Sequence, residues 1–128
     1  MTKNIVKYLS GALLLILAFG TTAAEVPFDQ ASFDRAKAAG DPVVVYFHAD
    51  WCPTCRVQQP IVARLAAEPG LKGVTIYEAD YDKETALEKT LHVGQQSTFV
   101  VFKQGHEISR STGQTQESAI RAELQKAL

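Results

Sequence analysis

Short runs of apolar residues recur along the chain and predict four β-strands. Residues 42–48 form a continuous apolar and β-branched run, which is typical of a strand buried on both faces. A second strand is predicted at 74–79, and a further pair at 98–103 and 107–112. The pair is separated by three residues that include Gly105, which adopts a positive φ easily, so these two strands are expected to form a hairpin.

Apolar residues with helical spacing fill the segments between these strands. The expected helices, with their end signals, are one ending at Ala39 (cap Asp29 or Ser32, stop Gly40), one at 53–67 with a kink at Pro60, one at 83–91 (cap Asp82), and one starting at Thr115 or Gln116. The resulting order combines a parallel crossover with a terminal hairpin. We therefore expect an α/β fold: a mixed β-sheet flanked by helices on both faces.

The first 24 residues follow a different pattern. Lys3 and Lys7 precede an apolar stretch at 9–19, and small residues follow at 22–24. This arrangement predicts a secretory signal peptide that is cleaved after Ala24. An uncleaved anchor is the alternative, but the apolar stretch is short against the roughly 20 residues that span a bilayer. We expect a periplasmic or secreted protein after signal-peptide removal.

Residues 25–128 would then form one domain, because 104 residues bury a single core and are too few for two. Loss of Lys3 and Lys7 leaves 11 of the 13 basic side chains against 14 acidic ones, a net charge of −3. This charge and the lack of a basic stripe argue against nucleic acid as a partner. We expect the protein to be a monomer.

The chain has two cysteines, which are too few for a small scaffold held together by several disulfides.

These two cysteines, Cys52 and Cys55, are separated by Pro53 and Thr54. If Cys52 lies at the exposed start of the helix and Cys55 one turn further in, their Cα atoms are about 5 to 6 Å apart, within disulfide range. The positive end of the helix then stabilises a thiolate on Cys52, and Cys55 is the more buried, resolving thiol. Such a small loop makes a weak structural staple, so the pair is interpreted as a redox site.

The motif Trp-Cys-Pro-Thr-Cys, Pro60 in the following helix, the hairpin at 98–107 and Gly113 before the last helix together resemble the thioredoxin superfamily. The resemblance covers nearly all of residues 25–128. It implies a thioredoxin fold and thiol–disulfide exchange through a mixed disulfide, with Cys52 as the nucleophile and Cys55 as the resolving thiol. It also implies that Trp51 packs beside the site and shields it.

Three positions depart from the family pattern. Gln96, Ser97 and Thr98 stand where the family has a cis-proline phrase that pairs with the substrate. A cis bond before a non-proline residue costs about 2.5 to 4 kcal/mol, so the bond before Ser97 is expected to be trans. Tyr46 replaces a buried acid that accepts a proton in many thioredoxins. A tyrosine with a pKa of about 10 is a poor base, which leaves water or Asp50 as the proton acceptor.

The third departure is His48, at a position that is often aromatic in the family. It would either add positive charge near the thiols or fill space with a hydrogen-bonded ring, and the second role is favoured. Zinc or copper binding by His48 and the two cysteines is not expected, because only one Cys-x-x-Cys is present and His92 and His106 are distant in the sequence.

These features predict a thiol–disulfide oxidoreductase that acts on protein disulfides outside the cytoplasm and needs no cofactor beyond its own cysteine pair. Pro53 is shared with disulfide-forming oxidases, whereas the compact domain resembles the reductases, and reduction is the favoured direction. Protein thiols and disulfides are the expected partners, and a membrane-bound redox relay is a further candidate. The alternative is a non-catalytic binding module that docks a partner, or holds a metal, through Cys52 and Cys55.

Overall fold

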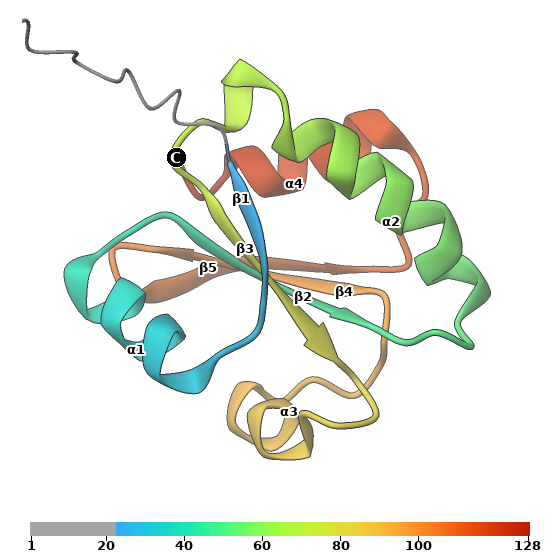
Figure 1. Ribbon diagram of the computed structural model, residues 1–128, viewed down its shortest axis with the longest axis horizontal. Coiled ribbons are helices and arrows are strands. Elements are labelled where there is room, and N and C mark those ends of the chain that lie inside the picture. The colour runs from blue at the N-terminus through green and yellow to red at the C-terminus, as the bar shows by residue number, and fades with distance from the viewer. Residues whose placement is uncertain (1–22) are drawn as a thin grey trace, which may run out of the picture.

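The computed structural model describes residues 23–128, whose five strands form one sheet in the order β1-β3-β2-β4-β5 (Figure 1). The strands are β1 (Ala24–Pro27), β2 (Val43–His48), β3 (Thr75–Asp80), β4 (Thr98–Lys103) and β5 (His106–Thr112). Strand β3 pairs in parallel with both β1 and β2, whereas β4 runs antiparallel to β2 and to β5. The predicted mixed sheet is confirmed.

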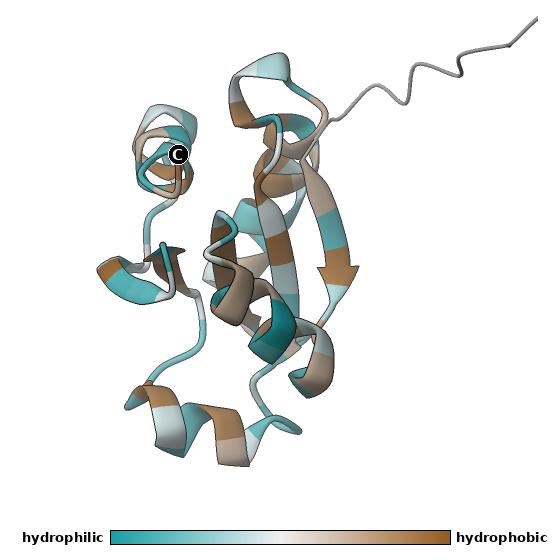
Figure 2. Ribbon diagram, turned by 90° about the vertical axis from the view of Figure 1, so that its left-hand side faces the viewer, coloured by the Kyte–Doolittle hydropathy of each residue, from teal (hydrophilic) through white to brown (hydrophobic). Residues whose placement is uncertain are grey.

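The helices are α1 (Gln30–Ala39), α2 (Pro53–Ala66), α3 (Thr85–Leu91) and α4 (Glu117–Gln125), with a short 3₁₀ turn η1 (Pro69–Leu71). Helices α2 and α4 pack on one face of the sheet, and α1 and α3 pack on the other, as Figure 1 shows. The expected helices on both faces are therefore confirmed. Figure 2 shows brown apolar segments along the strands, and helices on which brown and teal residues alternate.

Strand β2 is the centre of this arrangement. Val44 and Tyr46 point into the core under α2 and α4, whereas Val43, Val45 and Phe47 point into the core under α1 and α3. All five side chains are fully buried, which explains why the strand has no polar alternation in its sequence.

Several predicted end signals are confirmed. The Asp29 carboxylate accepts a hydrogen bond from the Ser32 N–H (2.8 Å) at the start of α1, and Gly40 ends that helix with φ 74°. The β4–β5 hairpin turns at Gln104 and Gly105, both with positive φ. Pro60 lies inside α2, which continues to Ala66.

Two predictions need correction. Strand β1 was not expected, because four residues at a sheet edge carry too little pattern to predict a strand. Asp82 does not cap α3, which begins at Thr85 with Glu84 in the cap position. Asp82 instead accepts a hydrogen bond from the Trp51 indole N–H (2.8 Å), so a tertiary contact has replaced the local one.

The predicted signal peptide lies outside the described residues apart from Ala23 and Ala24, so its cleavage stays a prediction. Across residues 23–128, none of the helices combines the length and the apolar character needed to cross a membrane.

A carboxyl pair joins the edge strand β1 to β3. Burial, followed by a hydrogen bond to Glu78 and repulsion from its charge, raises the pKa of Glu25 to about 8. Glu25 is therefore protonated at neutral pH. The folded-state pKa of Glu25 is higher than the usual value of 4.5, so the folded protein holds this proton more tightly than the unfolded chain does. The stabilisation that the protonated Glu25 gives the fold is complete below pH 4.5 and is lost as the pH rises through 8.

We predict that Glu25→Gln removes this loss, because the amide carries no charge at any pH. We compare the free energy of unfolding of the variant with that of the parent at each pH. The difference, variant minus parent, should be about 1 to 2 kcal/mol larger at pH 9 than at pH 4.5, after allowance for solvent screening. Urea denaturation at both pH values measures the difference, on protein that retains Ala23 and Ala24, because cleavage after Ala24 would place a charged α-amino group on Glu25. Asp41→Asn, at an exposed carboxyl before β2, is the control. An equal difference at both pH values would contradict the raised pKa of Glu25.

Candidate functional site

The two cysteines lie where β2 leads into α2. Cys52 occupies the N-cap of α2, Pro53 is the first residue of the helix, and the Cys52 sulfur accepts a hydrogen bond from the Cys55 N–H (3.1 Å). This is the predicted arrangement, with a free backbone donor of the first helical turn directed at a sulfur. Both residues are free thiols, and Thr54 lies between them, half-buried.

The expectation that Cys52 is exposed is wrong. Only 1% of its surface is accessible, against 0% for Cys55, so the two thiols hardly differ in burial. Ala49 packs with both sulfurs, and the half-buried Tyr81, from the loop after β3, covers them. The sequence carried no signal for Tyr81, because it reaches the cysteines only through the pairing of β2 with β3.

Burial is also the main reason why the pKa of Cys55 is raised to about 11. A side-chain hydrogen bond with Cys52 raises the pKa further, whereas backbone hydrogen bonds from Ala49 and Ser97 lower it in part. At neutral pH Cys55 is therefore a protonated thiol, and it must lose its proton before it can act as a nucleophile.

Tyr46 lies on β2, below α2, and is fully buried. Its hydroxyl donates a hydrogen bond to Gln58 Oε1 (3.0 Å), and its ring stacks on Phe99 with centroids 4.5 Å apart. Burial first, and then the nearby Cys55 and Cys52 sulfurs, raise the pKa of Tyr46 far above its ordinary value of 10. Tyr46 is therefore not a base near neutral pH, as the sequence indicated.

Gln58, on α2, was not identified from the sequence. It is fully buried, and its amide nitrogen donates to two backbone carbonyls, of Ser97 (3.3 Å) and Gln114 (2.9 Å). A signal was present: Gln58 follows Cys55 by three residues and precedes Val62 by four, on the stripe of α2 that faces the core. A polar residue on a buried stripe needs partners, and this amide has three.

Ser97 is buried and lies directly before β4. The bond before Ser97 is trans, as expected, since residues 23–128 contain no cis peptide. Its φ of 58° is in the left-handed region, which costs a residue with a side chain about 1 to 2 kcal/mol. Its carbonyl accepts hydrogen bonds from the Gly113 N–H (3.0 Å) and from Gln58, which hold this conformation.

The other two residues expected to bind substrate differ in their surroundings. The Thr98 hydroxyl is used within the protein: it donates to the Gln95 carbonyl (2.9 Å) and lies 2.8 Å from the Thr112 hydroxyl. Gln96 is half-buried, so part of it reaches solvent in the loop beside the cysteines.

The shielding of the thiols by Trp51 stays a prediction. Trp51 is 54% exposed and lies on the surface, where its indole N–H is bound to Asp82. Asp50 is exposed as well, and its carbonyl oxygen accepts hydrogen bonds from the Arg56 guanidinium (3.3 and 3.4 Å). Tyr81 is a side chain that packs against the cysteines and that the sequence did not indicate.

His48 ends β2 and has the surroundings of a space-filling ring. Its Nδ1 lies 3.1 Å from the Gln59 amide nitrogen, and its ring lies 5.4 Å from that of Tyr46. In the part of the chain that the structure describes, three or more His, Cys, Asp or Glu side chains nowhere gather as a metal site would require.

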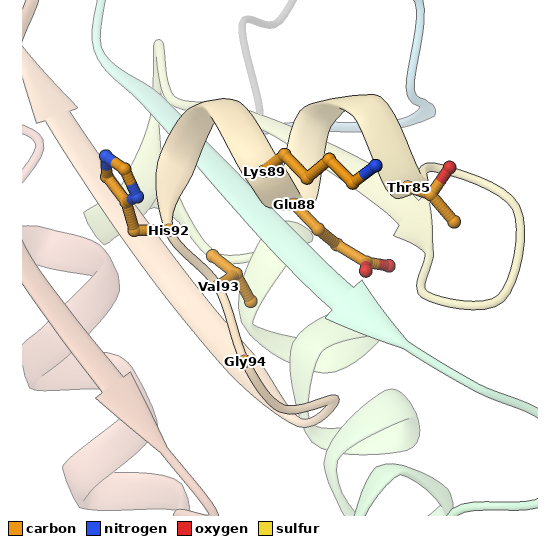
Figure 3. A pocket seen from close by; sticks show the side chains of 6 residues that line it. All are labelled: Thr85, Glu88, Lys89, His92, Val93 and Gly94. Atoms are coloured by element: carbon orange, nitrogen blue, oxygen red, sulfur yellow. The ribbon is translucent and has the colours of Figure 1, made fainter.

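An open pocket lies apart from the cysteines, along α3 and the residues that follow it (Figure 3). Its lining residues are Thr85, Glu88, Lys89, His92, Val93 and Gly94. It contains none of the residues described above, so it does not belong to the thiol site.

Comparison with known proteins agrees with this geometry. The family model described as Thioredoxin matches residues 24–126. Thioredoxin from Chlamydia pneumoniae is 39% identical over 82 residues, which cover 64% of this chain and 78% of that protein. Thioredoxin from Mycolicibacterium smegmatis is 33% identical over 88 residues, which cover 68% of this chain and 79% of that protein.

The crystal structure of Trxlp from Edwardsiella tarda is similar throughout, with a TM-score of 0.76 and 35% identity over 79% of this chain and 98% of that one. The thioredoxin fold expected from the sequence is therefore confirmed. With the Cys-x-x-Cys at the start of α2 and the family model spanning the sheet and all four helices, the chain belongs to the thioredoxin family.

Proposed function

We propose that this protein reduces disulfide bonds in other proteins outside the cytoplasm, with Cys52 as the nucleophile and Cys55 as the resolving thiol. Membership of the thioredoxin family supports thiol–disulfide oxidoreductase chemistry in general. The observation that carries the assignment of roles is the helix N-cap, where the Cys55 N–H points at the Cys52 sulfur while burial keeps the Cys55 thiol protonated.

The reaction would proceed in two exchanges. The Cys52 thiolate attacks one sulfur of the substrate disulfide, a Cys52–substrate bond forms, and the other substrate sulfur leaves as a thiolate that takes up a proton. Cys55 then loses its proton and attacks the Cys52 sulfur, which releases the second substrate thiolate. The substrate gains two electrons, and the protein is left with a Cys52–Cys55 disulfide that a dithiol partner must reduce.

A membrane-bound redox relay is the proposed source of those electrons, and the proposed working state is a monomer. The location rests on the pattern of residues 1–24 alone. Mass spectrometry of the protein recovered from an export-competent bacterial host tests it: a periplasmic chain that begins at Glu25 is expected. A full-length chain in the cytoplasm would overturn the proposal of export.

The covered Cys52 sulfur favours a second candidate, a binding module that docks a partner without turnover. Reduction of a disulfide-linked protein such as insulin, in the presence of a dithiol reductant, distinguishes the two. Catalytic turnover that is lost in Cys52→Ser supports the oxidoreductase. Binding of a partner with no turnover supports the module.

We predict that Cys55→Ser traps substrate proteins as mixed disulfides, because a nucleophile without its resolving thiol cannot release what it has attacked. Non-reducing electrophoresis of the variant after incubation with oxidised substrate proteins should show adducts that a reductant removes. Cys52→Ser is the matched control and should form none. The same adducts with both variants, or with neither, would exclude these roles.

The pKa of Cys55 also predicts how resolution depends on pH. Only a thiolate attacks, so with a pKa of about 11 the rate of resolution should rise about tenfold per pH unit between pH 7 and 10. Single-turnover release of substrate from a preformed Cys52 mixed disulfide measures this rate. Tyr46→Phe should leave the slope unchanged, because Tyr46 accepts no proton in this range. A plateau near pH 7 would show that an internal base removes the proton.

A further inference from the structure

Helix α2 holds the loop before β4 through Gln58. Gln58 lies three residues after Cys55 on one face of α2, and its Nε2 donates a hydrogen bond to the Ser97 carbonyl (3.3 Å). The loop is therefore tied to the helix that carries both thiols.

Gln58 ties in a second loop as well. Its amide nitrogen donates to the Gln114 carbonyl (2.9 Å) in the loop after β5, and its amide oxygen accepts from the Tyr46 hydroxyl (3.0 Å). Both N–H groups and the oxygen of the amide are used, and the side chain is fully buried. An apolar side chain at this position would leave the Gln114 carbonyl and the Tyr46 hydroxyl without this partner.

The conformation of Ser97 depends on such support. A proline has φ near −65°, whereas Ser97 has φ 58°, a value that persists in a residue with a side chain only where its surroundings enforce it. Gly113 and Gln58 supply that enforcement through the Ser97 carbonyl. Hydrogen bonds from neighbouring elements thus hold Ser97 in a conformation that a proline could not adopt.

We propose that Gln58 is a positioning residue for substrate binding: its amide holds residues 95–98 beside the cysteines in the geometry that receives the backbone of a protein substrate. This inference rests on the proposed function. Gln58 acts through Ser97 and touches neither substrate nor the reacting sulfurs. It therefore governs the binding of peptide substrates and not the reactivity of the thiols.

The test compares Gln58→Met with the parent on two substrates. For a protein disulfide, KM should rise about tenfold and kcat should change less than about twofold, as expected from the loss of buried hydrogen bonds that position the loop. For a small aromatic disulfide, which has no peptide backbone to pair, the rate should not change. Hydrogen exchange at the Gly113 amide, which donates to Ser97, should become faster.

Gln59→Met is the matched control, because Gln59 is the next residue on α2 and contacts His48 instead of the loop. It should leave KM for the protein disulfide unchanged. Gln58→Glu adds a readout that packing alone cannot move. Relative to the parent at the same pH, its KM should be raised at high pH, where a carboxylate repels the two carbonyls. Its KM should fall toward the parent value as the pH is lowered and this buried carboxyl takes up a proton, which it donates to a carbonyl.

An unchanged KM in folded Gln58→Met would overturn the inference, and so would an equal slowing with the small disulfide. If Gln58→Met does not fold, the pH series of Gln58→Glu decides, and a KM ratio independent of pH would count against the inference. A parent that turns over neither substrate contradicts the proposed function itself. If the parent is active and the Gln58 variants have the parent's KM for the protein disulfide, only the role of Gln58 is contradicted.

Discussion

The burial of β2 on both faces determines where the two thiols of this protein lie. Strand β2 pairs with β3 on one side and β4 on the other, and both of its faces are covered by helices. Because β2 and β3 are parallel and β4 is antiparallel to β2, the ends of the first two strands and the start of the third meet at one edge of the sheet (Figure 1). Cys52 follows β2, Tyr81 follows β3 and Ser97 precedes β4, so all three come together there.

The departures from the family pattern at Tyr46 and Ser97 are connected through one side chain. Gln58 accepts from the Tyr46 hydroxyl and donates to the Ser97 carbonyl. A buried carboxylate at position 46 would serve as a base, but it would also require a different partner. With tyrosine there, the site has a neutral, fully paired hydrogen-bond network beneath the cysteines, and it lacks a proton acceptor below Cys55.

Burial also limits the reactivity of the two thiols. Both thiols lie under Tyr81 and Ala49, and the low polarity around Cys55 keeps that sulfur protonated. Access of a substrate to Cys52 and loss of the proton from Cys55 are therefore the two steps that the fold makes costly.

The strands from β2 to β5, all four helices and the position of the thiol pair were predictable from the sequence, because each depends on local periodicity, caps or a motif within a few residues. The role of Asp82, the cover over Cys52 and the network of Gln58 were not. Trp51 and Asp82 are 31 residues apart, and Gln58 and Gln114 are 56 apart. Such contacts depend on strand order and register, which bring distant segments together, whereas local sequence patterns report only which side chains a helix or strand will bury.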